Sequence, residues 1–555
     1  MSKKIIIHSH FYQPPRQNPN TLEIDKEESA FPYHDWNERI TSECYRANAY
    51  ARYLDKDARI RKIINNYRYM SFNVGPTLLE YIEKKYPDVA SRILEADKDS
   101  IKRLGHGNAI AQGYNHTILP LDDKEFARNQ IKHGLDKFRS FFKRDAEGFW
   151  CPECAISPFV IDLLAEEGVK FTILSPLQIK SLIIEGVTIQ AKDIKYSMLA
   201  KPFYIRGNNH KICAMFYNAA LSSDISFNHL LQSADRLYDN IKQIFVESDS
   251  PLVMAATDGE IYGHHEPYGE MAFAALSEKV ASRGEFEFTN PAKYISENTP
   301  SDEAVLIDGE DNLGSSWSCF HGVSRWYKDC SCSTGGKEGW NQKWRTPLRK
   351  ALVKAKSSVM SEISAILKQH SLDVNETIRL PFESQQSMRI AAFDQSVKKA
   401  LEAYKWMSYS FTSCGWFFAD ISGLEASHNI GFMIKALKLL NLNKELEVFI
   451  NDLTQAESNI KEMQNGGEIA KNIIKTYFEN IDIKATITNI KRSGLTNENA
   501  DELLTSLMIQ GTSPTSDYYF DAQNTVYQEL QKGSGKEIKN IKLLAERLNL
   551  STMLI

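Results

Sequence analysis

The sequence predicts an α/β fold over its first 300 residues and a mainly α-helical region from residue 301 to residue 555. Up to about residue 300, short apolar runs alternate with longer segments of helical period, which is typical of βα units around a parallel sheet. Beyond that point the strand signal fades and amphipathic helical segments follow one another. Because a chain of 63.2 kDa exceeds the size of a single hydrophobic core, we predict two domains, 1–300 and 301–555.

The first half contains six predicted strands and five predicted helices. The strands are short apolar runs at 4–7, 69–74, 108–112, 148–150, 171–174 and 252–256. The helices are the periodic segments 38–55, 77–85, 124–142, 158–167 and 229–246. Asp122 or Asp123 is expected to cap the third helix and Ser157 the fourth, where Pro158 follows at the first helical position.

A β-hairpin is predicted as an insertion between the later strands, within residues 182–218. Two runs of strand-forming residues, 202–206 and 210–217, flank Gly207, Asn208 and Asn209. Glycine and asparagine tolerate the positive φ that a hairpin turn requires.

The second half is predicted to be almost entirely helical. Amphipathic segments occur at 347–369, 388–408, 429–440, 443–463, 467–479, 497–509 and 536–548. The glycine-rich stretch 335–339 is predicted to be a mobile surface loop.

Charge and hydropathy exclude some partners. There are 66 Lys and Arg against 71 Asp and Glu, a net charge of -5, which is too balanced to attract nucleic acid. The apolar run Ile5–Ile7 is too short for the core of a signal peptide, and no later segment could span a bilayer. We therefore expect a soluble, cytoplasmic protein that binds no membrane.

The eight cysteines do not form a disulfide framework in a chain of this length. Cys151 and Cys154 have the spacing of a redox or zinc pair, and Cys330 and Cys332 lie near Cys319. A composite thiolate site is therefore conceivable. However, zinc ligand pairs usually both have a gap of two to four residues, so we expect buried thiols and no bound metal.

Carboxylates follow two of the predicted strands. Glu153 comes directly after strand 148–150, and Asp258 follows strand 252–256. In a barrel of parallel strands, residues at the carboxyl ends converge on one mouth. Two such acids point to glycoside chemistry, in which one carboxylate attacks the sugar and the other handles the proton.

Histidines occupy equivalent positions. His8 and His10 follow the first strand and, being two residues apart, share one face of an extended chain. His116 follows strand 108–112. The alternative for these side chains is a structural role, with the rings bonded to backbone carbonyls in the core.

Four segments around these residues resemble the first four sequence regions of glycoside hydrolase family 57, in the same order and with similar spacing. They are HSHFYQPP at 8–15, GYNHTILP at 113–120, WCPECA at 150–155 and TDGEIYGH at 257–264. A fifth segment, LSSDISF at 221–227, resembles a loop of the amylase-like members. The resemblance covers roughly residues 1–300.

The resemblance implies an incomplete (β/α)7 barrel followed by a helical domain, and activity on α-glucans with retention of configuration. It assigns Glu153 as the nucleophile and Asp258 as the general acid/base. In retaining enzymes the two carboxyl groups lie about 5 to 5.5 Å apart. An oligo- or polysaccharide is the expected partner, with no cofactor, and the oligomeric state stays open.

The same resemblance implies sugar-binding roles for further residues. Trp150 would form an apolar wall beside the nucleophile, Glu260 would orient its neighbours, and Asp224 would either bind substrate or cap a helix near His229. The residues expected to hydrogen-bond sugar hydroxyls are His8, His10, Gln13, His116 and His264.

The helical half adds aromatic candidates. Trp317, Trp326 and Trp416 could stack on sugar faces, although tryptophans at helical spacing are as often core residues. His321 lies in a weak match to the family's fifth region. This half also resembles a C-terminal domain of unknown function, which leaves the linkage preference and the choice between hydrolysis and transfer open.

Two alternatives to a glycosidase stay open. Related barrels, such as polysaccharide deacetylases and α-mannosidases, bind zinc through Asp and His residues at strand ends, and His8, His10, His116 and Asp258 could form such a set. Consecutive residues rarely ligate one ion, so 264–266 is not expected to be a metal site. The other alternative is a carbohydrate-binding protein without catalysis.

Overall fold

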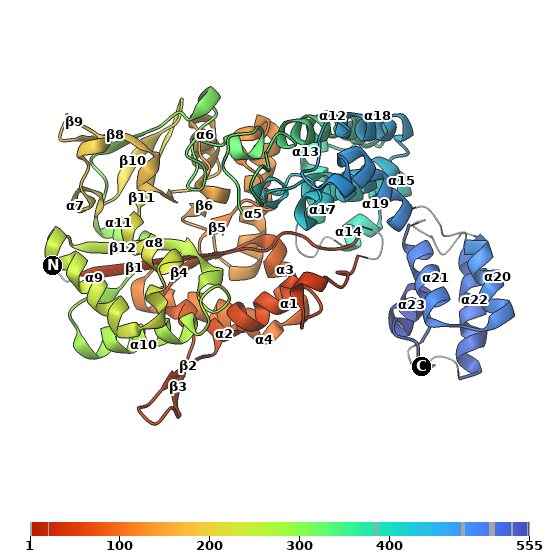
Figure 1. Cartoon of the computed structure of the whole chain (residues 1–555), viewed down its shortest axis with the longest axis horizontal. Coiled ribbons are helices and arrows are strands. Elements are labelled where there is room, and N and C mark those ends of the chain that lie inside the picture. Colours follow the sequence, from red (N-terminus) through yellow and green to blue (C-terminus); the bar gives the residue numbers. More distant parts are fainter. Residues whose placement is uncertain are drawn as a thin grey trace.

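The computed structural model describes residues 3–19, 22–382, 387–478, 483–509, 517–533, 537–551 and 553. Figure 1 shows an α/β part, a helical part beside it and a smaller helical group that carries the C-terminus. Within the described residues, each part has its own large cluster of buried hydrophobic side chains. The region predicted as one helical domain therefore contains two separate cores.

Strand β1 (Lys4–Phe11) lies at the centre of the parallel sheet that holds the site. It pairs in parallel with β12 (Leu252–Asp258) over seven residues, with β4 (Ser71–Val74) at its carboxyl end and with β13 (Glu287–Phe288) at its start. The uninterrupted apolar run Ile5–Ile7 fits this position, because a parallel strand is covered on both faces.

The parallel order continues through short strands. β5 (Ala111–Gln112) pairs with β6 (Phe149–Trp150), and β7 (Phe171–Leu174) pairs with β11 (Lys211–Phe216). Isolated parallel bridges join 72 to 109 and 148 to 171, so that β4, β5, β6 and β7 follow one another. The Asn218 amide, just after β11, donates to the Met254 carbonyl of β12 at 2.7 Å.

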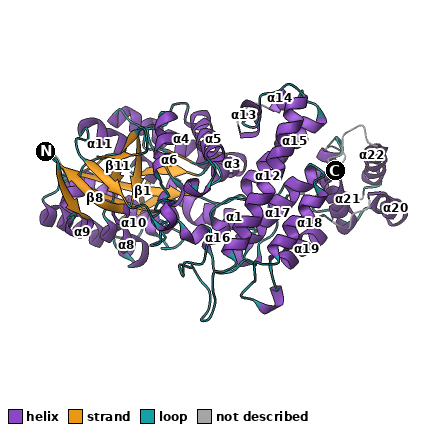
Figure 2. Ribbon diagram, turned by 90° about the horizontal axis from the view of Figure 1, so that it is seen from above, coloured by secondary structure: helices purple, strands orange, loops and turns teal. Residues whose placement is uncertain are grey.

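The predicted hairpin at 202–217 is present as β10 (Phe203–Arg206) and β11, which pair antiparallel. It belongs to a six-stranded sheet in the order β7-β11-β10-β14-β8-β9. Strands β8 (Ile179–Ile184), β9 (Val187–Gln190) and β14 (Glu303–Leu306) were not predicted; they extend this sheet beyond β10. Figure 2 shows the strands, β8 and β11 among them, to the left of the helical half.

Helices α3 (Pro76–Lys85), α5 (Lys124–Phe142) and α6 (Pro158–Glu166) are confirmed close to their predicted bounds. Asp123 caps α5 by accepting from the Phe126 amide at 2.9 Å. Ser157 occupies the N-cap position of α6, but its side chain makes no capping hydrogen bond.

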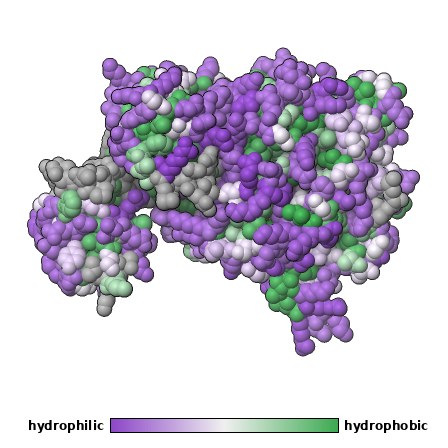
Figure 3. All heavy atoms as spheres, turned by 180° about the vertical axis from the view of Figure 1, so that it is seen from behind, coloured by the Kyte–Doolittle hydropathy of each residue, from purple (hydrophilic) through white to green (hydrophobic). Residues whose placement is uncertain are grey.

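The prediction of one helix over 38–55 is wrong at its end. The helical stretch α1 (Trp36–Ile40), a π-helical turn (Thr41–Tyr45) and α2 (Arg46–Ala49) gives way to the hairpin β2 (Ala51–Leu54) and β3 (Ile60–Ile64). Asp55 starts the turn, because its carboxylate accepts from the amides of residues 57 and 59. The hairpin projects from the body of the molecule in Figure 1 and, with apolar side chains exposed, in Figure 3.

Other helices of the first half differ from the prediction or were not predicted. The helix predicted over 229–246 begins later, as α9 (Ala234–Ser248), after the 3₁₀ turn Leu230–Gln232; α8 (Ala219–Phe227) precedes this turn and was not predicted. Three further helices are α4 (Pro87–Leu104), α7 (Tyr196–Leu199) and α10 (Gly269–Arg283), and α11 (Pro291–Glu297) ends this half.

The second half is helical, as predicted. Its first core is built from α12 (Arg345–Gln369), α13 (Val374–Thr377), α14 (Ser387–Ala391), α15 (Gln395–Tyr409), α16 (Cys414–Phe417), α17 (Leu424–Leu439), α18 (Asn443–Leu453) and α19 (Gly466–Tyr477). The C-terminal group consists of α20 (Ile483–Ser493), α21 (Asn497–Ile509), α22 (Asp517–Gln531) and α23 (Ile541–Arg547). Residues 479 and 536, at the ends of two predicted helices, lie outside the described residues. No helix in the described ranges is both long enough and apolar enough to cross a membrane.

Candidate active site

The two predicted catalytic carboxylates lie at the carboxyl ends of parallel strands. Glu153 sits in the short 3₁₀ turn Pro152–Cys154 directly after β6, with a φ of 58°. A positive φ is uncommon for a residue with a side chain, and such backbone strain often marks functional positions. Asp258 is the last residue of β12, where it is paired with His10 of β1. Residues in register on neighbouring parallel strands point to the same face.

Glu153 is held by donors from the loop that enters the helical half. Its Oε2 accepts from Trp317 Nε1 at 3.0 Å and from Ser318 Oγ at 2.7 Å, and its backbone carbonyl accepts from the Trp317 amide at 3.0 Å. Burial raises the pKa of Glu153, while the bonds from Ser318 and Trp317 oppose this rise. These donors stabilise the ionised carboxylate in one orientation.

We predict that Trp317→Phe lowers kcat about tenfold, because a hydrogen bond to a charged group contributes roughly 1.5 kcal/mol or more. Loss of this donor also raises the pKa of Glu153 further, so the acidic limb of the kcat/KM profile moves to higher pH. Trp406→Phe is the matched control, since Trp406 Nε1 donates to a glutamate, Glu402, within α15. An unchanged acidic limb in Trp317→Phe would contradict the role of this bond.

Asp258 has a pKa well above the usual aspartate value. Burial among the surrounding side chains is the largest cause, followed by the negative charges of Glu260 and Glu153. Solvent nevertheless reaches the Asp258 side chain. Water access reduces the desolvation, so the rise is smaller than a sealed position would give, but like charges act in the same direction. Asp258 is therefore the carboxyl group of the pair that is suited to carry a proton.

Glu260 follows Asp258 by two residues and is almost fully buried. Its Oε1 accepts from Tyr45 Oη at 2.6 Å and from the Tyr12 amide at 3.1 Å. Burial raises the pKa of Glu260 to about 7, against the lowering effect of these bonds. Near neutral pH this side chain is partly protonated, and its charge in turn acts on Asp258.

We predict that Glu260→Gln changes stability in a pH-dependent way. The folded-state pKa of about 7 lies above the unfolded value, so the stabilising contribution is complete below about pH 4.5 and is lost as the pH rises to 7. The loss amounts to about 3 kcal/mol. Relative to the wild type, the glutamine variant should gain stability between pH 5 and 8 in urea unfolding and none at pH 4. A gain that is equal at every pH would contradict this.

Three buried histidines form a chain of hydrogen bonds that ends in the helical half. Asn73 Nδ2 donates to His10 Nδ1 at 2.8 Å, which leaves the His10 proton on Nε2. His10 Nε2 lies 3.1 Å from His116 Nε2, and His116 Nδ1 lies 2.7 Å from Ser413 Oγ. The order of donors implies that His116 carries its proton on Nδ1 and donates to Ser413. The chain thus joins β4, β1 and the segment after α15.

These histidines are neutral. Burial, with a smaller effect of the neighbouring histidine on His8, lowers the pKa of His8 and of His10 to about 3. Burial also lowers the pKa of His116 well below its usual value. His8 bonds to Ser71 Oγ at 3.0 Å and to Asn73 Oδ1 at 3.2 Å.

Trp150 packs against two of these histidines. Its ring stacks on His8 at 4.9 Å and on His10 at 5.0 Å, and the Trp317 ring meets it edge-on at 5.0 Å. Tyr12 stacks on His116 at 3.9 Å on the other side. Trp150 is fully buried, so its ring stabilises the positions of His8 and His10 from inside the protein.

Three further residues of the first half were predicted to bind substrate, and each has its own partners outside the histidine chain. Gln13 is buried and accepts from Arg16 at 3.3 Å. His264 bonds to Glu43 at 2.5 Å and lies against Trp36. Asp224 does not cap a helix near His229. It lies inside α8, accepts from Asn228 at 2.7 Å, and faces a hollow of about 440 Å³ lined partly by α9.

Of the residues predicted in the helical half to bind substrate, only one reaches the site. Trp317 reaches the site, whereas Trp326 and Trp416 have no exposed surface and belong to the helical core. The expected stacking on sugars has no open ring face at these two residues, because both rings are fully buried; the Arg349 guanidinium lies over the Trp416 ring, 5.3 Å from its centroid. His321 does not contact Glu153; its Nδ1 lies 3.5 Å from Cys332 Sγ.

Some residues of the site were not predicted. Asn73 and Ser413 bind the histidine chain, Ser318 binds Glu153, and Tyr12 and Tyr45 hold Glu260. Asn73 could have been found as a polar residue near the end of an apolar strand. Ser413 lies in the run that was selected for Trp416, but nothing in the sequence pairs it with a histidine 297 residues earlier.

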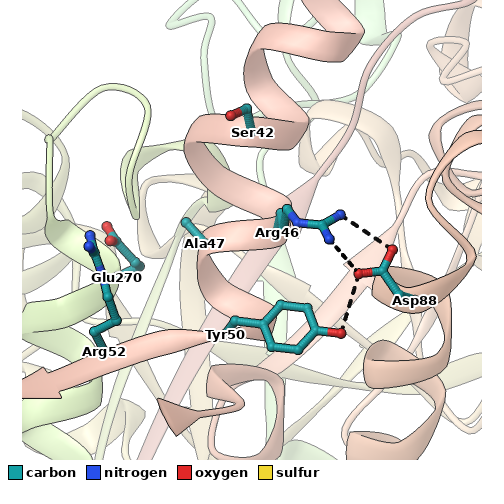
Figure 4. A pocket seen from close by; sticks show the side chains of 7 residues that line it. All are labelled: Ser42, Arg46, Ala47, Tyr50, Arg52, Asp88 and Glu270. Atoms are coloured by element: carbon teal, nitrogen blue, oxygen red, sulfur yellow. Dashed lines mark hydrogen bonds and ion pairs between the residues drawn. The ribbon is translucent and has the colours of Figure 1, made fainter. Parts of the chain in front are cut away.

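The structure also contains hollows away from the carboxylates. Figure 4 shows one of about 510 Å³ beside α2, in which Asp88 bonds to Arg46 at 2.8 Å and to Tyr50 at 3.3 Å. Arg46, Tyr50 and Asp88 bind one another, and none of the predicted site residues lines this hollow. Among the described residues, the one group arranged to hold a metal consists of Cys319, His321, Cys330 and Cys332. Cys151 and Cys154 are free, buried thiols.

Comparison with known families gives two matches. Residues 5–307 match the profile of Glycosyl hydrolase family 57, and residues 340–536 match a domain of unknown function, DUF3536. No curated protein matches the chain.

Solved structures share the fold at low sequence identity. An exo-type maltose-forming amylase from Pyrococcus sp. ST04 is 17% identical with a TM-score of 0.61, over 99% of this chain and 96% of that one. A branching enzyme from Thermococcus kodakaraensis is 13% identical with a TM-score of 0.50, over 86% and 94%. A 4-α-glucanotransferase from Thermococcus litoralis is 16% identical with a TM-score of 0.49; the match covers 79% of this chain but only 60% of that protein's length.

Proposed function

Since the chain belongs to glycosyl hydrolase family 57, we propose that it is a retaining glycosidase or transglycosidase that acts on α-glucans such as maltodextrin, starch or glycogen fragments. Glu153 is the nucleophile and Asp258 the general acid/base. The observation that carries this proposal is the pairing of two strand-end carboxyl groups of unlike character. Glu153 is held by donors that favour its ionised form, and Asp258 is surrounded by negative charge that favours its protonated form.

The proposed reaction has two displacements. In the first, Glu153 forms an ester bond to the anomeric carbon while the glycosidic bond breaks and Asp258 gives its proton to the departing oxygen. In the second, ionised Asp258 takes a proton from water or from a sugar hydroxyl, whose oxygen displaces Glu153. The first acceptor gives hydrolysis and the second gives transfer, and both retain the configuration.

The neutral histidines support substrate binding in this scheme. Every ring nitrogen of His8, His10 and His116 is already hydrogen-bonded within the protein, so these neutral rings would bind a sugar hydroxyl only in exchange for one of these bonds. Because they carry no charge, they do not compete with the carboxylates for protons. We propose that Gln13, Trp150 and Glu260 keep these histidines and Asp258 in place.

The strand order supports the family architecture. We propose that β1, β4, β5, β6, β7, β11 and β12 form the incomplete (β/α)7 barrel and that residues 1–300 are the catalytic domain. The helical domain that follows completes the site through Trp317, Ser318 and Ser413.

A zinc-dependent hydrolase of a related barrel is disfavoured by the same contacts. Its ligands would be His8, His10, His116 and Asp258. Both ring nitrogens of His10 and both of His116 already bind Asn73, Ser413 or one another, so an ion would have to displace this network.

Product analysis tests the proposed function. Purified protein is incubated with α-1,4- and α-1,6-linked glucans, and the anomeric products are followed by NMR from the first turnover. Retention with glucose-oligomer products supports the proposal, and the product sizes separate hydrolysis from transfer. Inversion, removal of acetyl groups from an acetylated polysaccharide, or tight oligosaccharide binding without turnover would each contradict it.

A further inference from the structure

The segment between the catalytic barrel and α12 brings together three cysteines and a histidine. Cys319 Sγ lies 3.8 Å from Cys330 Sγ and 3.9 Å from Cys332 Sγ, and Cys332 Sγ lies 3.5 Å from His321 Nδ1. The four ligand atoms are all within 4.8 Å of one another. Cys319 and Cys330 are buried, and the other two side chains are partly exposed.

These separations match the edges of a zinc tetrahedron. With Zn–S bonds of about 2.3 Å and a Zn–N bond of about 2.0 to 2.1 Å, tetrahedral geometry places two sulfurs about 3.8 Å apart and a sulfur and a nitrogen about 3.6 Å apart. The three measured separations agree with these edges. Three thiolates and one imidazole are also a common ligand set of structural zinc sites.

The spacing of the four ligands along the sequence differs from that of common zinc motifs. The backbone conformation explains how the four side chains can nevertheless meet. Each ligand pair has one intervening residue, 319–321 and 330–332, rather than two to four. Ser331 adopts a φ of 66° and Gly322 a φ of 86°. These left-handed residues make tight turns, between the last two cysteines and directly after the histidine.

A buried cation lies beside the cluster. Arg345 is fully buried, donates from Nη1 to the Cys332 carbonyl at 2.7 Å, and interacts electrostatically with Cys330 and Cys319. Its Nε and Nη2 have no hydrogen-bond partner. Asp329 contributes one negative charge near this guanidinium, but a buried charge whose donors are unpaired is costly. Three thiolates around one Zn²⁺ carry a net charge of -1, which would complement this guanidinium.

We propose that this segment binds one zinc ion in a closed, structural site whose four ligands are Cys319, His321, Cys330 and Cys332. All four positions of the tetrahedron come from protein side chains, so no open position is left for water or substrate. Binding deprotonates the three thiols and releases three protons to solvent.

The site has a consequence for the catalytic centre, and this part rests on the proposed function. Trp317 and Ser318, which donate to Glu153, immediately precede the first ligand, Cys319. The zinc ion would tie this segment to residues 330–332. The ion thereby fixes the donors that orient Glu153, although it touches no substrate.

Metal analysis of the full chain tests the site. The protein is purified without chelator after expression in zinc-supplemented medium, and its metal content and X-ray absorption are measured. We expect one zinc per chain, with three sulfur neighbours at about 2.3 Å and one nitrogen at about 2.0 to 2.1 Å. Less than a tenth of an equivalent of zinc, in protein that also takes up none on zinc titration, would overturn the proposal, as would a Cys319–Cys330 disulfide in the native protein.

Variants separate specific binding from adventitious binding. Cys330→Ser/Cys332→Ser should lower zinc content at least about tenfold, in line with the weight that ligands carry in such sites. The matched control is Cys213→Ser on β11, which should keep one equivalent. Should the double variant fail to fold, His321→Ala, at a partly exposed position, should weaken zinc affinity about tenfold or more in competition with a chelating dye. Unchanged zinc in these variants would refute the assignment.

The two proposals fail separately. Zinc bound with three sulfur neighbours in a protein that turns over no α-glucan leaves the metal site standing and removes the function. Full α-glucan activity in protein that neither contains zinc nor takes it up on titration does the reverse. If both hold, chelation should lower kcat with little change in KM, and zinc but not magnesium should restore it.

Discussion

Glu153→Gln is expected to lower kcat on maltooligosaccharides by about 10⁴-fold or more, because no other group can form the glycosyl ester. The substitution is nearly isosteric. The glutamine oxygen can still accept from Trp317 and Ser318, so the fold and the binding of oligosaccharide should persist. Rates are measured by release of reducing ends, and folding by thermal unfolding and circular dichroism.

The control for this variant is Glu247→Gln, at an exposed position on α9, which should retain wild-type activity. Glu153→Ala provides a second check. A small anion such as azide can enter the vacated space and attack the anomeric carbon, so azide should restore turnover and give a product of inverted configuration. Wild-type rates in Glu153→Gln would refute the assignment of the nucleophile.

Asp258→Asn is expected to lower kcat on maltooligosaccharides by about 10² to 10⁴-fold, the usual contribution of a general acid/base. The amide cannot donate the proton that the leaving oxygen needs. A substrate such as α-glucosyl fluoride needs no such proton, so the loss in the rate of its first step should be much smaller. The ratio of the two losses, measured under pre-steady-state conditions, identifies the role.

The pH dependence provides an independent test of Asp258. Because the pKa of Asp258 is raised, the wild type should stay active to a pH well above the ordinary aspartate range, and the alkaline limb of kcat/KM should disappear in Asp258→Asn. Asp239→Asn, an exposed position on α9, is the control. Equal losses of rate on maltooligosaccharides and on α-glucosyl fluoride in Asp258→Asn would contradict an acid/base role.

The sequence predicts those parts of the fold that depend on local patterns. The apolar runs locate β1, β4, β6, β7 and β12, and helical period locates α3, α5 and α12. Polar candidate residues directly follow several of these apolar runs. Because side chains at the carboxyl ends of parallel strands converge, the sequence was enough to predict that Glu153, Asp258 and the histidines share one site.

The parts that were missed depend on tertiary contacts. The 38–55 segment has helical period throughout, yet its end pairs with 60–64, because the Asp55 turn allows a hairpin to form. Helix α4 was not predicted, although Pro87 at its first position is a usual start signal.

The site shows the same division. Glu153 and Asp258 were recognisable from their own neighbourhoods, but the groups that tune them come from elsewhere. Ser318 and Ser413 act across the junction between the two halves, and only the folded chain shows that junction. The one-residue gaps within 319–321 and 330–332 likewise gave no zinc signal in the sequence, because four side chains that meet only in the folded chain need not follow a regular spacing.

The most direct test of the account is to trap the glycosyl-enzyme. A fluorosugar that forms the ester but releases it slowly, such as 5-fluoro-α-glucosyl fluoride, is added to the wild type, and the digested protein is examined by mass spectrometry. We expect one added sugar per chain, on the peptide that contains Glu153, and none in Glu153→Gln. A label on a different residue, or rapid turnover without any covalent adduct, would contradict it.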